Sequence, residues 1–76
     1  MISDQIHAIW ARELKLTDFS EGDDFFELGG HSLIMARIQT AIQQEFGAEI
    51  PMDELMRHST VQQISVYLEK AAAVTH

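Results

Sequence analysis

A serine that follows two glycines and a histidine is the residue of this chain best placed for covalent chemistry. The segment reads Gly29-Gly30-His31-Ser32-Leu33, and a helical pattern begins at the serine. Two glycines allow the backbone to turn tightly into the helix. Because a helix begins with unpaired N–H groups and the positive end of its dipole, a phosphate on the Ser32 hydroxyl would be stabilised there. We therefore interpret Ser32 as an attachment point.

Ser32 and His31 also permit other interpretations. A serine at this position is a common helix N-cap, and a neighbouring imidazole could act as the base for a serine nucleophile. The nucleophile is disfavoured because Gly30-His31-Ser32-Leu33-Ile34 lacks the second glycine of a nucleophile elbow, and the chain cannot hold the sheet that such an elbow requires. The role of His31 stays open: it caps the helix, or it contacts a modifying enzyme or the phosphate.

The chain shows no pattern of metal ligands. It contains no cysteine, and its four histidines have no close metal-ligand spacing. Residues 18–27 hold five acidic residues and no basic one, but they lack the residue spacing and turn glycine of a calcium-binding EF-hand. We expect no metal site and interpret this acidic segment as a solvated connection. Thiol chemistry would need a group attached to the chain.

Length and composition predict a small helical domain. The chain has 76 residues, 46% of them hydrophobic and only one of them proline. Such a chain can form one domain with a modest core and is too apolar to be disordered. Its formal net charge of -7 argues against nucleic acid and favours basic or neutral protein surfaces as partners. No apolar run could span a membrane, and Met1-Ile2-Ser3-Asp4 does not resemble a signal peptide, so we expect a soluble cytoplasmic protein.

Helical periodicity predicts two longer helices in the first half of the chain. The first runs from about Ser3 to Leu14, with Ser3 as its N-cap. The second runs from Ser32 to Phe46 and is stopped by Gly47. Apolar residues on one face of each helix should form the core: Ile2, Ile6, Ile9, Trp10 and Leu14 in the first helix, and Ile34, Ile38, Ala41 and Ile42 in the second.

Two further helices are expected in the second half. Pro51 suits the first turn of a short third helix over 52–58, and residues 60–63, Thr-Val-Gln-Gln, form a capping box that opens the fourth. The residues of the fourth helix expected to face inward are Val61, Ile64, Leu68 and Ala72. The tail over 73–76 should fray. With no internal repeat or linker, residues 1–76 are expected to be a single all-α domain, a small four-helix bundle.

A long connection over residues 15–31 joins the first two helices. It contains Phe19, Phe25, Phe26 and Leu28. A loop this long in so small a domain is either functional or disordered, and its aromatic residues favour an ordered loop packed over the helices. We expect some of these rings to lie in the core.

Leu33 is predicted to lie off the core face, beside Ser32. At 100° per residue from Ser32, the expected core stripe is centred at about 220°, Leu33 lies at about 100° and Ala36 at about 40°. An apolar side chain here suits a partner contact, although a single exposed leucine is common. Further candidates for partner contact are Ala36, Arg37, Met52 and Met56. The two methionines equally suit gaps in the core, and the arginine a solvated helix face.

The segment over residues 24–33 resembles a known modification motif. Its sequence, Asp-Phe-Phe-Glu-Leu-Gly-Gly-His-Ser-Leu, is similar nearly letter for letter to that of the peptidyl carrier (thiolation) domains of non-ribosomal peptide synthetases, within the carrier protein superfamily. The family also has similar residues at Trp10, Phe46, Gly47, Ile50, Pro51, Thr60 and Val61. The resemblance therefore covers almost the whole chain.

The resemblance implies a four-helix bundle that is not itself an enzyme. The Ser32 hydroxyl would be joined by a phosphodiester to 4′-phosphopantetheine, transferred from coenzyme A by a phosphopantetheinyl transferase. The thiol of this arm would hold an aminoacyl or peptidyl group as a thioester for adenylation, condensation and thioesterase domains. Gly29, Gly30, His31 and Leu33 would support the motif. A cytoplasmic monomer serving the synthesis of antibiotics or other secondary metabolites is implied.

Charge separates the carrier classes. Fatty-acid acyl carrier proteins typically present Asp-Ser-Leu and an acidic second helix. Here His31 precedes the serine, and residues 32–46 contain only Arg37 and Glu45 as charged residues, which disfavours a fatty-acid role. An acyl or aryl carrier of a polyketide-type pathway stays open, as does an unmodified helical interaction module. The sequence identifies neither the cargo nor whether the carrier is free-standing or part of a synthetase.

Overall fold

Four helices account for the regular structure of residues 2–74, which are the residues that the computed structural model describes, with side chains through Ala71. The helices are α1 (Ile2–Leu14), α2 (Ser32–Phe46), α3 (Met52–Arg57) and α4 (Val61–Val74). The prediction of an all-α bundle with a short third helix is confirmed.

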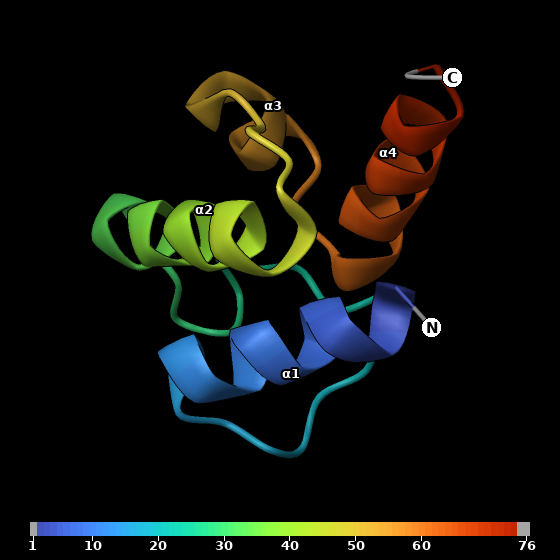
Figure 1. Cartoon of the computed structure of the whole chain (residues 1–76). Coiled ribbons are helices and arrows are strands. Elements are labelled where there is room, and N and C mark those ends of the chain that lie inside the picture. Colours follow the sequence, from blue (N-terminus) through green and yellow to red (C-terminus); the bar gives the residue numbers. More distant parts are fainter. Residues whose placement is uncertain (1, 75–76) are drawn as a thin grey trace.

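The helices are arranged around α1 and α2. α1 packs against both α2 and α4, and α3 packs against α2. In Figure 1, α2 lies above α1, α4 stands to one side, and α3 lies above α2. The connection between α1 and α2 passes along the outer side of α1 before it returns to the start of α2 (Figure 1).

Each helix contributes an apolar face to one core. The buried apolar residues are Ile6, Ile9, Trp10, Phe25, Met35, Ile38, Ala41, Ile42, Ile50, Leu55, Val61, Ile64 and Leu68. Ile2 and Leu14 are partly buried against them, so the predicted apolar face of α1 is confirmed. The ring of Trp10 meets that of Phe25 edge to face, with 5.3 Å between the centroids. This contact ties the long connection to α1.

The core face of α2 differs from the prediction at one position. Ile38, Ala41 and Ile42 are buried as expected, but Met35 is buried in place of Ile34, which is only partly buried. The helix is thus turned slightly from its expected orientation. An unbranched methionine adapts to an irregular gap better than a β-branched isoleucine, which favours this choice.

The ends of α1 and α2 test two predicted signals. Gly47 ends α2 in a left-handed conformation with φ of 67°, and its N–H donates to the Gln43 carbonyl at 2.9 Å, as predicted. The N-cap prediction for Ser3 is wrong, because α1 is already helical at Ile2 and Ser3 lies within its first turn. The apolar side chain of Ile2 packs against the core, which favours the longer helix.

The short helix α3 ends one residue earlier than predicted. The backbone leaves the helical region at His58, which is the C-cap with φ of −102° and ψ of 77°. Its N–H still donates to the Glu54 carbonyl at 2.9 Å. Pro51 is the N-cap, with ψ of 147°, and so stands just before the first turn rather than in it.

Thr60 caps the start of α4 as predicted, but the Gln63 side chain accepts from the Thr60 hydroxyl and not from the Thr60 N–H, as it would in a full capping box. The Gln63 N–H donates to the Thr60 hydroxyl oxygen at 3.1 Å, and that hydroxyl donates to the Gln63 side-chain oxygen at 3.2 Å. The inward positions of Val61, Ile64 and Leu68 are confirmed. The predicted inward side chain of Ala72 lies outside the described residues. Of the tail expected to fray, 73–74 belong to α4, and 75–76 lie outside the described residues.

Candidate functional site

Ser32 is the first residue of α2, and its side chain is exposed. It is therefore not the N-cap; that position belongs to His31, whose backbone is extended and whose side chain makes no capping hydrogen bond. The first turn of α2 contains no acidic residue. Because the N–H groups of a first turn lack acceptors within the helix, they favour an anion together with the helix dipole. A phosphodiester on the Ser32 oxygen fits this position without disturbing the core.

Gly29 and Gly30 shape the backbone that leads to Ser32, each for a different reason. Gly29 has a φ of 92°, a conformation that favours glycine. Gly30 lies directly over the buried Phe25 ring, and a Cβ at this position would overlap three of the ring carbons. The prediction that both glycines allow a tight backbone path into the helix is confirmed.

Asp24 organises the turn before these glycines. Its Oδ2 accepts hydrogen bonds from the N–H groups of Phe26 (2.9 Å) and Glu27 (3.2 Å), and its Oδ1 accepts one from the Ser59 hydroxyl (2.6 Å). The Ser59 hydrogen bond is the main cause that lowers the pKa of Asp24 below its ordinary value; burial opposes it, and the two N–H groups add to the lowering. The carboxylate form thus holds the turn and joins it to the α3–α4 connection.

Further contacts fix the acidic connection to the helices. The Phe25 N–H donates to the Ser59 carbonyl at 2.7 Å, and the Gln62 N–H donates to the Glu21 carbonyl at 3.1 Å. The expectation of an ordered loop packed over the helices, with some rings in the core, is confirmed.

A histidine of α1 holds the middle of the same connection. The His7 ring stacks on the Phe19 ring, with 4.1 Å between the centroids and an angle of 11° between the planes. Nε2 of His7 also lies 2.9 Å from the Phe19 carbonyl oxygen, which accepts its hydrogen bond. Phe19 is partly buried against the core. The connection is therefore anchored on α1 as well as on the α3–α4 connection.

The candidate partner-contact residues differ in exposure. Leu33 is 60% exposed, as its helical position predicts, and Arg37 is also exposed. Ala36, Met52 and Met56 are partly buried, and both methionines pack against the core. The structure therefore places one large apolar side chain, Leu33, directly beside Ser32.

The alternative chemistries gain no support from the geometry. Among residues 2–74, no hydrogen bond joins the exposed side chains of His31 and Ser32, so a nucleophile and base are not assembled. No group of three or more His, Asp or Glu side chains in the described part of the chain could hold a metal ion. Within the same residues, no helix is both long and apolar enough to cross a bilayer.

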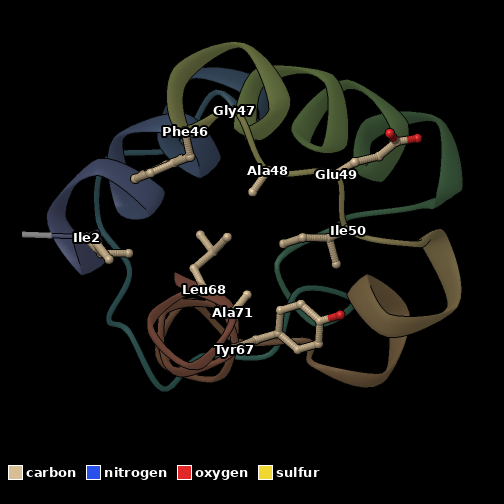
Figure 2. Close-up of a pocket in the computed structure, with 9 residues that line it drawn as sticks. All are labelled: Ile2, Phe46, Gly47, Ala48, Glu49, Ile50, Tyr67, Leu68 and Ala71. Carbon is tan, nitrogen blue, oxygen red and sulfur yellow. The ribbon is translucent and has the colours of Figure 1, made fainter. Parts of the chain in front are cut away.

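A cavity of about 430 Å³ lies at the other end of α2. Figure 2 shows Leu68, Ala48 and Ile50 pointing into it, with Tyr67 and Phe46 at its edge. Since α2 rises about 1.5 Å per residue, Phe46 lies about 21 Å along the helix from Ser32. The Ser32 site is thus a surface site, separate from this cavity.

Two residues that position the site carry no predicted role in the sequence. Asp24 and Ser59 form its shortest side-chain hydrogen bond but are 35 positions apart. The contacts of Asp24 with Phe26 and Glu27 have a local signal, because an aspartate often accepts hydrogen bonds from the N–H groups two and three residues later. No local pattern pointed to Ser59.

The fold and the site define a small helical bundle that presents one exposed serine at a helix N-terminus, with a fixed glycine turn before it. The family described as phosphopantetheine attachment site matches residues 4–68, and the chain belongs to this family. It is a carrier domain, and its cofactor is 4′-phosphopantetheine.

Relatives of the chain include very large synthases. Over 67 residues it is 39% identical to polyketide synthase PksN of Bacillus subtilis (strain 168). The aligned segment covers 88% of this chain and 1% of that protein. Over 64 residues it is 33% identical to tyrocidine synthase 3 of Brevibacillus parabrevis, and this segment covers 84% of this chain and 1% of that protein. The chain thus spans about 1% of the length of these two relatives.

A solved structure shares the fold. It is described as a non-covalent extended docking domain complex of the Pax NRPS, PaxA T1-CDD/PaxB NDD. The similarity has a TM-score of 0.89 and 32% sequence identity, and it covers 99% of this chain and 72% of that chain. Similarity over nearly the whole chain places all four helices in one known arrangement.

Proposed function

We propose that Ser32 carries the phosphopantetheine arm, and that residues 1–76 form one carrier domain. The observation that carries this proposal is the exposed serine at the first position of α2, in a chain that belongs to this family. The glycine turn and the absence of acidic side chains in the first turn of α2 support it. A first turn without carboxylates leaves its N–H groups and the helix dipole available to a phosphate, which favours a phosphodiester at this exposed oxygen.

The modification is a phosphoryl transfer from coenzyme A. The Ser32 hydroxyl oxygen forms a bond to the phosphorus that carries the pantetheine, and the bond from this phosphorus to the bridging oxygen breaks. Adenosine 3′,5′-bisphosphate leaves, and the hydroxyl proton passes to the transferase. His31, exposed next to Ser32, is close enough in the chain to contact the transferase or the phosphodiester. The chain itself contributes the nucleophilic oxygen and its position.

The attached arm supplies a thiol that a chain without cysteine lacks, and this thiol holds an acyl group as a thioester. The bundle tethers this group and presents it to partner enzymes, and a flexible tether raises the local concentration to the order of mM. In this proposal the domain does not catalyse. It acts in the cytoplasm, as a monomer, with a phosphopantetheinyl transferase, an adenylation domain and condensation or thioesterase domains as partners.

The pathway that we favour is non-ribosomal peptide synthesis, with an aminoacyl or peptidyl cargo. The motif over 24–33 and the similarity to tyrocidine synthase 3 and to the Pax NRPS complex support it. An acyl carrier role in a polyketide-type pathway is the second candidate, because PksN is a polyketide synthase. α2 contains only Arg37 and Glu45 as charged residues, which supports neither partner class over the other but disfavours a fatty-acid role.

The proposal predicts one modification at one residue. When the purified protein is incubated with coenzyme A, magnesium and a broad-specificity phosphopantetheinyl transferase, its intact mass should rise by one phosphopantetheine. Ser32→Ala should stay unmodified, and Ser3→Ala, which removes another helical serine, should be modified like the wild type. An unmodified wild type, or a modified Ser32→Ala, contradicts the proposal.

A second prediction concerns the surface that partner enzymes contact, for which we propose Leu33, with Ala36, Arg37, Met52 and Met56 around it. Leu33→Asp should leave the bundle folded, because this side chain is exposed, and should slow loading by an adenylation domain about tenfold. The aspartate removes an apolar contact and asks the partner to desolvate a carboxylate. The rate of thioester formation on the modified protein measures this effect.

The matched control is Val66→Asp, which adds the same charge at an exposed apolar residue of α4. It should load at the wild-type rate. Circular dichroism and thermal melts establish that both variants are folded. Unfolding by Leu33→Asp would place this residue in the core, and loading at the wild-type rate would remove it from the partner surface.

A further inference from the structure

An exposed aromatic ring, that of Phe26, belongs to the turn that leads to Ser32. Among the described side chains, the large apolar ones that are exposed are Phe26 (49%), Leu33 (60%) and Val66 (43%). Leu33 follows Ser32 directly and Phe26 stands six positions before it, whereas Val66 lies on α4. The two neighbouring phenylalanines have opposite environments, because Phe25 is fully buried and Phe26 faces solvent. Core packing therefore accounts for Phe25 and leaves about half of the Phe26 side chain without a partner.

The Phe26 ring is held in a fixed position. Its N–H donates to Oδ2 of Asp24 at 2.9 Å, and its carbonyl accepts from the Gly29 N–H at 3.2 Å. The ring meets that of Phe25 edge to face, with 5.4 Å between the centroids and 79° between the planes. An aromatic side chain held in this way loses little conformational entropy when a partner covers it.

The turn also fixes Phe26 relative to Ser32. The Gly30 N–H donates to the Phe25 carbonyl at 3.0 Å, and Gly30 lies against the Phe25 ring. Phe25 is thus the neighbour of Phe26 in the chain and of Gly30 through this hydrogen bond. Only His31 separates Gly30 from Ser32. An enzyme that reaches the Ser32 oxygen must approach this turn.

Acidic residues precede and follow Phe26 in the sequence. The connection carries Asp18, Glu21, Asp23 and Glu27, and it has no basic residue over 18–27. Glu27, directly after Phe26, is exposed. α2 contributes no carboxylate to its first turn. Phe26 thus offers an apolar ring next to the exposed carboxylate of Glu27 in the sequence, and the complement of this pair is an apolar pocket edged by lysine or arginine.

We propose that Phe26, with the carboxylate of Glu27 beside it, is a docking element for the phosphopantetheinyl transferase. This inference rests on the proposed modification of Ser32. The transferase is the partner to which we assign it because its chemistry occurs at the Ser32 oxygen itself. An enzyme that acts on the cargo reaches the thiol at the end of the arm and can dock through Leu33 alone, whereas a transferase must bring its active site to the Ser32 oxygen and so covers the turn before it.

The test is the kcat/KM for transfer of a fluorescent phosphopantetheine from labelled coenzyme A by the broad-specificity transferase. Phe26→Ala should lower kcat/KM about tenfold, and Phe26→Leu, which keeps an apolar side chain, should recover most of the loss. Val66→Ala is the matched control and should change kcat/KM by less than about twofold. Thermal melts establish that each variant is folded at the assay temperature. If Phe26→Ala is not folded, Phe26→Gln, which removes the apolar ring but keeps a long side chain, serves as the test and should show the same loss.

The charge is tested separately with Glu27→Gln. This variant should lower kcat/KM at low salt, and the difference from the wild type should vanish at high salt, because salt screens exposed charges. A salt-independent effect, or none, would overturn the role of Glu27.

The docking role and the modification itself fail in different ways. A wild type that is modified, with folded Phe26→Ala and Val66→Ala modified equally fast, would overturn the docking role of Phe26 alone. A wild type that takes up no phosphopantetheine would overturn both. A loss confined to the Phe26 variants supports the docking element.

Discussion

Gly30→Ala is expected to lower the free energy of unfolding by about 1 to 3 kcal/mol, the usual cost of forcing an extra carbon into a packed site. The new Cβ would overlap three ring carbons of Phe25. This ring cannot move aside, because it is fully buried and packs edge to face on Trp10. The strain therefore falls on the turn that leads to Ser32. Urea unfolding of the variant and the wild type measures the change.

The matched control for this prediction is Gly22→Ala in the same connection. A Cβ at Gly22 would meet no heavy atom within 4 Å, and its φ is not positive. Gly22→Ala should therefore change the free energy of unfolding by less than about 0.5 kcal/mol, as other surface substitutions do. Equal effects of the two substitutions would show that the contact with Phe25 does not require a glycine at position 30.

Ile38→Ala is expected to destabilise the protein by about 2 to 5 kcal/mol. Ile38 is fully buried in the middle of α2, so its truncation removes contacts with the core and leaves a cavity. A domain of this length has a total stability of only about 4 to 11 kcal/mol, so the loss is a large part of it. Thermal and urea unfolding followed by circular dichroism measure the loss.

Ser32→Ala is the comparison on the same helix. Its side chain is exposed and is not the N-cap, so the substitution should change stability by less than about 0.5 kcal/mol. If Ile38→Ala and Ser32→Ala lost the same stability, the core face assigned to α2 would be wrong.

The helices could be predicted because their signals are local. Gly47 ends α2 at the predicted residue, and Thr60 is the N-cap of α4, as the sequence predicts. The exposed position of Leu33 follows from the period of α2 alone. Where two apolar residues compete for one place, as Ile34 and Met35 do, periodicity is too coarse, and packing against the other helices decides.

The connection before Ser32 could be predicted to be ordered but not in detail. An irregular segment has no period, so nothing in the local sequence distinguishes the buried Phe25 from the exposed Phe26. Trp10 of α1 and Ser59 before α4 determine which ring turns inward, through a ring contact and a backbone hydrogen bond. Both partners are distant in the sequence, so their effect appears only in the folded molecule.

The hydrogen bond between Asp24 and Ser59 also constrains the order in which the molecule assembles. The two residues are 35 positions apart, with α2 and α3 between them. Single helices form from local contacts, whereas this pairing requires a long loop to close, which is slower and entropically costly. The turn before Ser32 is therefore completed only when the start of α4 has docked. The turn that leads to Ser32 is thus a product of the whole fold and not of the segment over 24–33 alone.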